Sequence, residues 1–193
     1  LFHSHTTKLP SLKRIITAGA PATIDLQKRF RHLLEDHTAL FGIYGATETL
    51  PIAKIESREV FALNENTKNG AGSCLGKPIE GVTVRIIGIS ETAISEWQDD
   101  LTVKPNVVGE ITVQSAATTR EYLNRPESNR ISKIEYRGGI IHRMGDVGYF
   151  DEEGRLWYCG RKSHRVITKD DVMFTEQIEN IFNAHALVYR TAL

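Results

Sequence analysis

Apolar residues follow two different spacings in this chain, and the change comes near residue 70. Before it, short apolar runs at 12–17 and 40–44 each suit a buried strand. Between the runs, four residues recur at helical spacing behind Thr23, a favourable helix cap: Leu26, Phe30, Leu33 and Leu34. Strand, helix and strand joined by short turns predict a βαβ unit of an α/β sheet.

Residues 70–160 alternate with period two instead. Val82, Val84 and Ile86 alternate with polar residues, and the segment 110–114 does the same, which predicts half-buried strands. The turn residues 151–154 separate two apolar runs and predict a hairpin. One interruption, 125–134, predicts a short helix that begins near Pro126. We therefore expect a small, mainly antiparallel β unit here.

The pattern changes again after Gly160. A polar, basic segment precedes a short strand at 166–168, a turn, and a helix at 175–184 capped by Thr175. The helix has apolar residues on one face: Ile178, Ile181 and Phe182. The apolar pair Leu187 and Val188 suggests the start of another strand. A domain that ended at Leu193 would expose the apolar face of this strand, so we expect the sequence to be truncated.

The charge and cysteine content argue against several classes of partner and site. The chain has 24 basic and 24 acidic residues, so no overall field favours nucleic acid or an anionic membrane. No apolar run approaches the ~20 residues of a membrane span. Cys74 and Cys159 lack the spacing of a zinc site. A disulfide remains an alternative, but two reduced thiols in the cytoplasm are the favoured interpretation.

The segment Tyr44-Gly45-Ala46-Thr47-Glu48 ends the second predicted strand, where α/β sheets place their ligands. An aromatic ring can stack on a base, a hydroxyl can bind a phosphate oxygen, and a carboxylate can hold Mg²⁺. By itself, the segment equally fits an ordinary turn with a surface Thr and Glu.

Three further segments carry candidate chemistry. In 142–146, a carboxylate after a glycine could accept both hydroxyls of a ribose, or cap its own turn. The basic segment 160–165 could meet phosphate or ribose oxygens, or be a solvated linker. The small residues at 18–21 could let a flat ligand edge approach the backbone, or form a simple turn.

The order of these segments, with Gly-Glu-Ile at 109–111 between them, resembles the adenylate-forming superfamily of acyl-CoA synthetases, adenylation domains and firefly-type luciferases. The resemblance extends from about Leu12 to Leu193. YGATE resembles the family's aromatic-Gly-x-Thr-Glu motif. HRMGD resembles Tyr-Arg-Thr-Gly-Asp, with His142 for the aromatic and Met144 for Thr. The resemblance implies an enzyme that uses ATP and Mg²⁺ to activate a carboxylic acid as an acyl-AMP.

The resemblance also implies individual roles. The nucleotide-binding residues would be Gly19, Ala20, Pro21, Tyr44, Gly45, Ala46, Thr47, Asp146 and Arg161. Thr47 would contact the α-phosphate and Glu48 would ligate Mg²⁺, which makes both catalytic. Asp146 would bind the ribose hydroxyls with help from Arg161. Lys162 would be the hinge about which a C-terminal domain moves.

The implied fold is α/β plus β, in three parts. Residues 1–69 would end an α/β sheet subdomain, residues 70–160 would form a small distorted β-barrel, and residues 161–193 would begin an α+β C-terminal domain. Two family parts are missing: the phosphate loop, expected before Leu1, and the catalytic Lys, expected after Leu193. We therefore expect this fragment alone to be inactive.

Within the superfamily, YGATETLP, the stretch 142–166 and the segment ending in Trp97 resemble olefin β-lactone synthetases, which adenylate a long-chain β-hydroxy acid. Enzymes that use coenzyme A typically carry Lys-x-x-Gly after the hinge. Here Ile167-Thr168-Lys169-Asp170 occurs, and the Asp170 side chain would obstruct a pantetheine tunnel. The alternatives are an acyl-CoA or acyl-carrier-protein ligase, and a non-catalytic relative that binds nucleotide or a partner protein.

Overall fold

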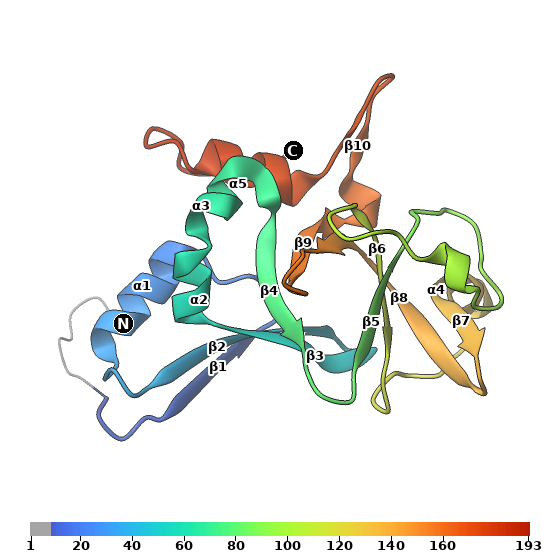
Figure 1. The fold of residues 1–193 in the computed structure, drawn as a ribbon, viewed down its shortest axis with the longest axis horizontal. Helices are drawn as coiled ribbons and strands as arrows, with labels where there is room; N and C mark the ends of the chain where they lie inside the picture. The colour runs from blue at the N-terminus through green and yellow to red at the C-terminus, as the bar shows by residue number, and fades with distance from the viewer. Residues whose placement is uncertain (1–8) are drawn as a thin grey trace.

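A computed structural model describes residues 9–193, and one curved mixed sheet extends through most of them (Figure 1). Its strand order is β1-β2-β3-β4-β9-β8-β6-β5, with β7 added beside β8. The strands are β1 (Arg14–Ala18), β2 (Ala39–Ala46), β3 (Thr49–Glu56), β4 (Ser73–Pro78), β5 (Thr83–Ile87), β6 (Gly109–Gln114), β7 (Lys133–Tyr136), β8 (Gly139–Phe150) and β9 (Leu156–Arg161). The fold is therefore mixed α/β, as the sequence predicted.

Helices and short turns lie between and beyond these strands. They are α1 (Ile24–Leu33), α2 (Ser57–Ala62), α3 (Asn64–Asn66), the short π-helix η2 (Thr67–Ala71), η3 (Asp99–Leu101), α4 (Pro126–Ser132), η4 (Lys162–His164) and α5 (Thr175–Asn183). A separate two-stranded ribbon consists of β10 (Val166–Ile167) and β11 (Val172–Met173). Figure 1 shows this ribbon projecting from the body of the molecule near α5.

The predicted βαβ unit is confirmed. Strands β1 and β2 pair in parallel, with Ala18 opposite Ile43. Helix α1 connects them, and the Thr23 hydroxyl accepts a hydrogen bond from the Leu26 amide at 3.3 Å. Leu34 is buried at the end of the helix, whereas Leu26 is 47% exposed, so the helix uses only part of its predicted apolar face.

The sheet continues without a break past residue 70. Strand β3 pairs antiparallel with β2 and also with β4, which in turn pairs with β9. Side chains from both regions share one core, including Ile52 of β3, Ile111 of β6 and Leu156 of β9. This continuity brings the end of β2 beside the antiparallel strands. The boundaries of the predicted units 1–69, 70–160 and 161–193 stay a prediction, and residues 1–8 lie outside the described residues.

The predicted hairpin over residues 147–158 is also confirmed. Strands β8 and β9 pair antiparallel around the turn 151–154. The Asp151 carboxylate stabilises this turn by accepting hydrogen bonds from the backbone amides of Glu153 and Arg155 and from the Trp157 indole. Arg155 also pairs with Asp151 at 2.7 Å. The hairpin places Asp146 of β8 directly opposite Arg161 of β9.

Two expectations for the C-terminal region are wrong. Phe174, rather than Thr175, is the residue before α5, and no side chain caps the helix. Leu187 and Val188 form no strand: Val188 donates to the His185 carbonyl in a turn, and Leu187 is 90% exposed. An apolar pair becomes a strand only where another strand is available to pair with it. The predicted strand at 166–168 is present as β10.

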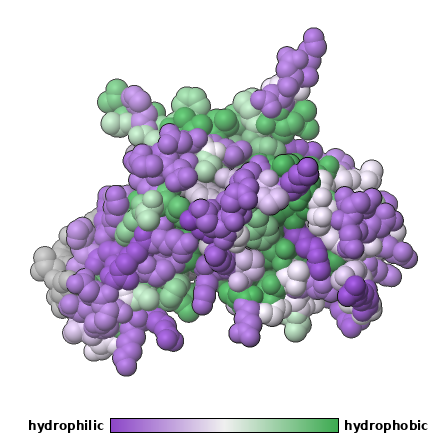
Figure 2. Space-filling model, viewed as in Figure 1, coloured by the Kyte–Doolittle hydropathy of each residue, from purple (hydrophilic) through white to green (hydrophobic). Residues whose placement is uncertain are grey.

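The surface in Figure 2 is mostly polar, with apolar patches between the polar regions. Both cysteines are free thiols, as expected, and Cys159 is fully buried. Burial raises the pKa of Cys159 to about 12, so this thiol stays neutral. Among residues 9–193, no helix combines the length and the apolar character that crossing a membrane requires.

Candidate functional site

The candidate nucleotide site lies where the α/β strands meet the antiparallel strands. Because β1 and β2 are parallel, their carboxyl ends lie at the same edge of the sheet. Gly19, Ala20 and Pro21 follow β1 directly and are exposed, beside the end of β2 that carries Tyr44. The structure thus brings two of the predicted segments together at one edge.

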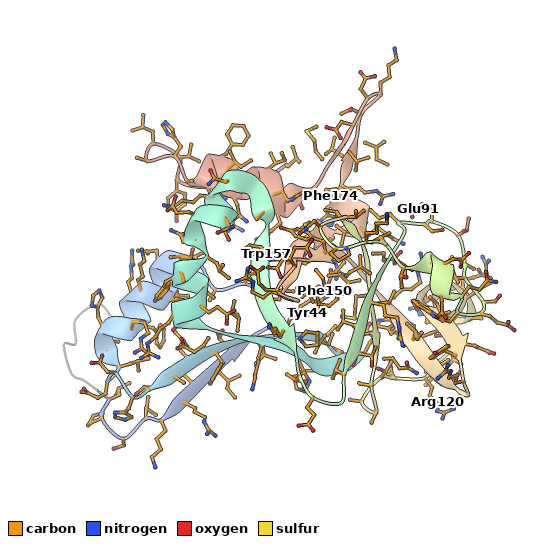
Figure 3. The ribbon with its side chains drawn as sticks, in the orientation of Figure 1. Tyr44, Glu91, Arg120, Phe150, Trp157 and Phe174 are labelled. Atoms are coloured by element: carbon orange, nitrogen blue, oxygen red, sulfur yellow. The ribbon has the colours of Figure 1, made fainter. Side chains whose placement is uncertain are left out.

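Tyr44 reaches across this edge to the antiparallel strands. Its hydroxyl donates to Oδ2 of Asp146 at 2.6 Å, over a separation of 102 residues. Figure 3 labels Tyr44 near the middle of the molecule, where these strands meet. Burial, followed by the charge of Asp146, raises the pKa of Tyr44 well above its usual range. The phenol therefore remains a neutral donor to the carboxylate.

Asp146 is a buried carboxylate with two different partners. Its Oδ1 accepts from Nη1 of Arg161 at 2.7 Å, while its Oδ2 accepts from Tyr44. The Asp146 side chain is 6% exposed, but that of Arg161 is 53% exposed, so the guanidinium lies at the surface. The hydrogen bond to Asp146 raises the pKa of Arg161. The alternative in which Asp146 caps its own turn does not occur, because this residue lies inside β8.

The turn at 47–48 carries the other predicted side chains. Gly45, near the end of β2, packs closely against the next strand, since a Cβ there would lie 2.5 Å from the Leu50 side chain and 3.0 Å from the Thr49 carbonyl oxygen. Ala46 ends β2, and Thr47 is exposed at the tip of the turn. Glu48 is only partly exposed and points toward residues far along the chain.

Tyr122 holds Glu48, and sequence reasoning missed it. The Tyr122 hydroxyl donates to Oε1 of Glu48, and this hydrogen bond is the main cause that lowers the pKa of Glu48. Asn129 fixes the backbone of Tyr122 from both sides, at 2.7 and 3.0 Å. A lone tyrosine in a loop offers no sequence signal, because its partner lies 74 residues away.

Lys133 and His142 complete the surroundings of Tyr122. The Lys133 ammonium lies 5.1 Å from the centre of the Tyr122 ring, and the His142 ring meets it edge-on at 6.3 Å. His142 is 3% exposed and pairs through Nδ1 with the Ser132 carbonyl at 3.1 Å. Burial and the charge of Lys133 lower the pKa of His142 to about 4, so the imidazole is neutral at pH 7.

The comparisons with known proteins fit this arrangement. The family model described as AMP-binding enzyme matches residues 2–123, which is more than half of the chain. The chain belongs to this AMP-binding family. It is accordingly a member of the adenylate-forming superfamily that its motifs indicated.

Two curated relatives and one solved structure are similar to this chain over most of its length. The chain is 46% identical to an olefin beta-lactone synthetase from Xanthomonas campestris pv. campestris over 96% of its length and 34% of that protein. It is 28% identical to a 2-succinylbenzoate–CoA ligase from Bacillus cereus over 93% of its length and 32% of that protein. The O-succinylbenzoate coenzyme A synthetase from Bacillus subtilis, in complex with ATP and magnesium ion, has a TM-score of 0.72 at 24% identity, over 99% of this chain and 35% of that one. The chain thus spans about a third of the relatives it matches.

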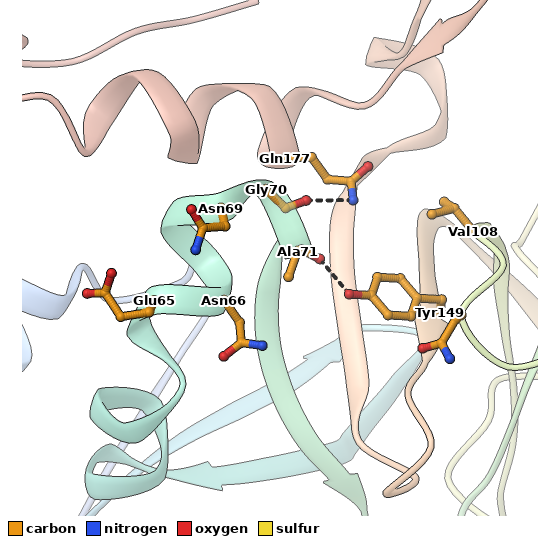
Figure 4. A pocket seen from close by; sticks show the side chains of 9 residues that line it. Glu65, Asn66, Asn69, Gly70, Ala71, Val108, Tyr149 and Gln177 are labelled. Atoms are coloured by element: carbon orange, nitrogen blue, oxygen red, sulfur yellow. Dashed lines mark hydrogen bonds between the residues drawn. The ribbon is translucent and has the colours of Figure 1, made fainter.

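Two cavities in the described part of the chain are lined by residues other than the predicted nucleotide-binding ones. One, of about 510 Å³, lies between η2, the end of β8 and α5, and Figure 4 shows the Tyr149 hydroxyl and the Gln177 amide at its edge. These groups donate to the backbone carbonyls of Ala71 and Gly70. The other, of about 460 Å³, borders Tyr122. We place the candidate site at Asp146 on side-chain geometry, because neither cavity is lined by a predicted nucleotide-binding residue.

Proposed function

We propose that this chain contributes the adenosine- and magnesium-binding part of an ATP-dependent synthetase that activates a carboxylic acid as an acyl-AMP. The observation that carries the proposal is the buried Asp146 carboxylate, held by Tyr44 and Arg161 beside the turn that presents Thr47 and Glu48. A carboxylate has about four lone-pair directions, so two remain for a ribose diol after these two partners are satisfied.

The residues fit ATP and Mg²⁺ chemically. The lowered pKa of Glu48 keeps its carboxylate ionised, and Mg²⁺ prefers hard oxygen ligands with only one or two carboxylates per site. The exposed Thr47 hydroxyl is available to an α-phosphate oxygen, and the exposed backbone of 19–21 to a flat base edge. Adenylation breaks the bond between the α- and β-phosphates, and its transition state depends on positioning and charge stabilisation. When bound, Mg²⁺ supplies part of that charge stabilisation.

For the acid, we propose a long-chain β-hydroxy fatty acid. The first support is the 46% identity to an olefin beta-lactone synthetase. The second is Asp170, which lies between β10 and β11 and whose side chain would obstruct a pantetheine tunnel. In the second step, the hydroxyl oxygen of the substrate would attack its own activated carbonyl, lose its proton and release AMP. Proximity within one molecule replaces a second substrate in this step.

A second candidate is an acyl-CoA or acyl-carrier-protein ligase, which the 28% identity to a CoA ligase favours. One experiment separates the two. The full-length protein is incubated with ATP, Mg²⁺ and a β-hydroxy fatty acid, with and without coenzyme A, and the products are identified by mass spectrometry. A β-lactone in both reactions supports the proposal, whereas a thioester found only with coenzyme A supports the ligase. A protein that binds AMP but forms neither product, and no acyl-AMP either, would be the non-catalytic relative.

A further inference from the structure

Three charged side chains from distant segments meet in the interior: Glu110, Arg143 and Lys162. Glu110 of β6 accepts two hydrogen bonds from Arg143 of β8, at 3.2 and 2.7 Å. The ammonium of Lys162 lies 3.2 Å from Oε1 of the same carboxylate. The Glu110 and Arg143 side chains are each 1% exposed, and that of Lys162 is 12% exposed. Lys162 is therefore the outermost member of a buried cluster.

The loop 88–92 ties the same cluster to the segment that follows β9. The Ser90 carbonyl accepts from the Lys162 ammonium at 2.9 Å and from Nη2 of Arg143 at 2.6 Å. Glu91 pairs with Arg165, three residues after Lys162. Figure 3 labels Glu91 beside this segment, at the base of the β10 ribbon. Residues 162–165 are thus attached to the body of the molecule by side chains rather than by the sheet ladder, which ends at Arg161.

Because of the charges in the cluster, losing Lys162 and losing Arg143 would have different consequences for Glu110. Glu110 carries one negative charge, while Arg143 and Lys162 carry two positive charges between them. If Lys162 leaves, Glu110 and Arg143 remain as a neutral pair with two hydrogen bonds, and the ammonium regains water. If Arg143 is lost, Glu110 stays buried and keeps only the cation at the edge of the cluster. Removing a partner from a buried pair is costly because it leaves a charge without compensation.

We propose that Glu110 and the Ser90 carbonyl form a releasable clasp that positions Lys162 and the segment 162–165, while Arg143 keeps Glu110 neutralised whether the clasp is closed or open. Glu110 is a positioning residue that acts through Lys162. The clasp itself follows from these contacts. Its use in turnover, which is to hold the segment beside Arg161 while nucleotide is bound and to free it afterwards, rests on the proposed function.

Hydrogen–deuterium exchange of the full-length protein, followed by mass spectrometry, tests the clasp. Lys162→Gln should accelerate exchange in 162–168 about tenfold or more, since hydrogen bonds to charged groups are lost. Lys169→Gln is the matched control, because among the described residues Lys169 makes no ion pair and is exposed. It should leave this exchange unchanged. Equal exchange in wild type and Lys162→Gln would overturn the clasp.

Two further measurements isolate the roles of Glu110 and Arg143. Lys162→Gln should accelerate exchange less in a Glu110→Gln background than in wild type, because interacting residues are not additive. Arg143→Gln should lower the urea midpoint of unfolding far more than Lys162→Gln does. Equal losses would contradict the proposal that Lys162 can leave Glu110 while Arg143 keeps that carboxylate neutralised. AMP binding by the wild-type chain is measured in parallel. An absence of binding beside the expected exchange pattern would count against the proposed function and leave the clasp standing.

Discussion

Asp146 connects three strands through its two oxygens. Tyr44 reaches it from β2 and Arg161 from β9, while Asp146 itself lies in β8. The carboxylate is buried, whereas the side chain of its arginine partner is half-exposed and reaches the surface. Such a pair orients an acceptor without fully consuming it.

Replacing Asp146 tests this role. Asp146→Asn keeps the size of the side chain but removes the charge, and hydrogen bonds to charged groups contribute ~1.5–3 kcal/mol. We expect the affinity for ATP to fall roughly 10- to 100-fold, as measured by isothermal titration calorimetry. Asp100→Asn, an exposed residue in η3, is the matched control and should leave binding unchanged. Equal ATP affinity in Asp146→Asn and wild type would contradict the assignment.

Tyr122 should matter for magnesium rather than for folding. Tyr122→Phe keeps the ring contacts with Lys133 and His142 and removes only the hydroxyl that orients Glu48. In the full-length enzyme, we expect the Mg²⁺ concentration for half-maximal ATP–pyrophosphate exchange to rise about threefold or more. Tyr136→Phe makes the same chemical change in a residue that contacts Trp97, and it should have no such effect. A magnesium dependence identical to wild type in Tyr122→Phe would rule out the orienting role.

His142 should make the stability depend on pH. Its folded-state pKa is about 4, below an ordinary value near 6.5, so the unfolded chain binds more protons between these values. The contribution of neutral His142 to the free energy of unfolding is therefore fully present above about pH 6.5. It is lost as the pH falls toward 4, which lowers the free energy of unfolding by up to roughly 3 kcal/mol. Urea unfolding at several pH values measures the slope. His142→Gln should flatten it in this window, and an unchanged slope would assign it to other groups.

Among the elements, α5 contacts three others: η2, β4 and β9. Gln177 donates to the Gly70 carbonyl of η2 at 2.8 Å, and Glu176 accepts from Ser73 of β4. At the start of the helix, Thr175 lies close to Gly160. A Cβ added at Gly160 would lie only 2.4 Å from the Thr175 hydroxyl oxygen. Glycine at the end of β9 thus permits the close approach of α5 to the sheet.

Two glycines with positive φ allow that contact to be tested. Gly160 has φ of 128° and meets Thr175, whereas Gly154, with φ of 72°, has open space where its Cβ would lie. Gly154→Ala should cost about 1 kcal/mol from backbone conformation alone, and Gly160→Ala roughly 2–4 kcal/mol because steric overlap is added. Urea unfolding of both variants measures the difference. Equal losses would mean that α5 does not press on β9.

For the whole molecule, the continuous sheet places the predicted adenosine and magnesium residues on one framework. The strands that carry Tyr44, Asp146 and Arg161 all belong to it. Yet the chain spans only about a third of its curated relatives. The phosphate loop and the catalytic lysine of the family are expected outside residues 1–193.

We therefore predict that residues 1–193 bind AMP but do not turn over. Binding would follow from the proposed contact of the Asp146 carboxylate with the ribose hydroxyls, whereas turnover needs cations around the transferred phosphates that this chain is not expected to supply. Calorimetry with AMP and an ATP–pyrophosphate exchange assay on the same preparation check both parts. A clear exchange signal from this chain would contradict the prediction.

Much of the fold follows from the sequence because it depends on neighbours along the chain. The helical spacing after Thr23, the alternation at 110–114 and the turn at 151–154 each act over a few residues, and each predicted element is present. The half-burial predicted for the strand at 110–114 is wrong, because residues 109–113 of β6 are buried on both faces of the sheet. The motifs also identified Tyr44, Asp146 and Arg161, whose side chains are in contact. The pair Leu187 and Val188 was misjudged because a strand needs a partner that local sequence does not reveal.

Only the tertiary structure decided which side chains support these residues. Tyr122 meets Glu48 across 74 positions, and Lys162 meets Glu110 across 52. Neither spacing has a period or a turn signal, because such contacts arise when the sheet brings distant strands together. The sequence alone therefore determined the elements and the family's binding motifs, through local conformational preference. The folded sheet determined how those motifs are oriented and held, because burial and charge pairing depend on neighbours in space.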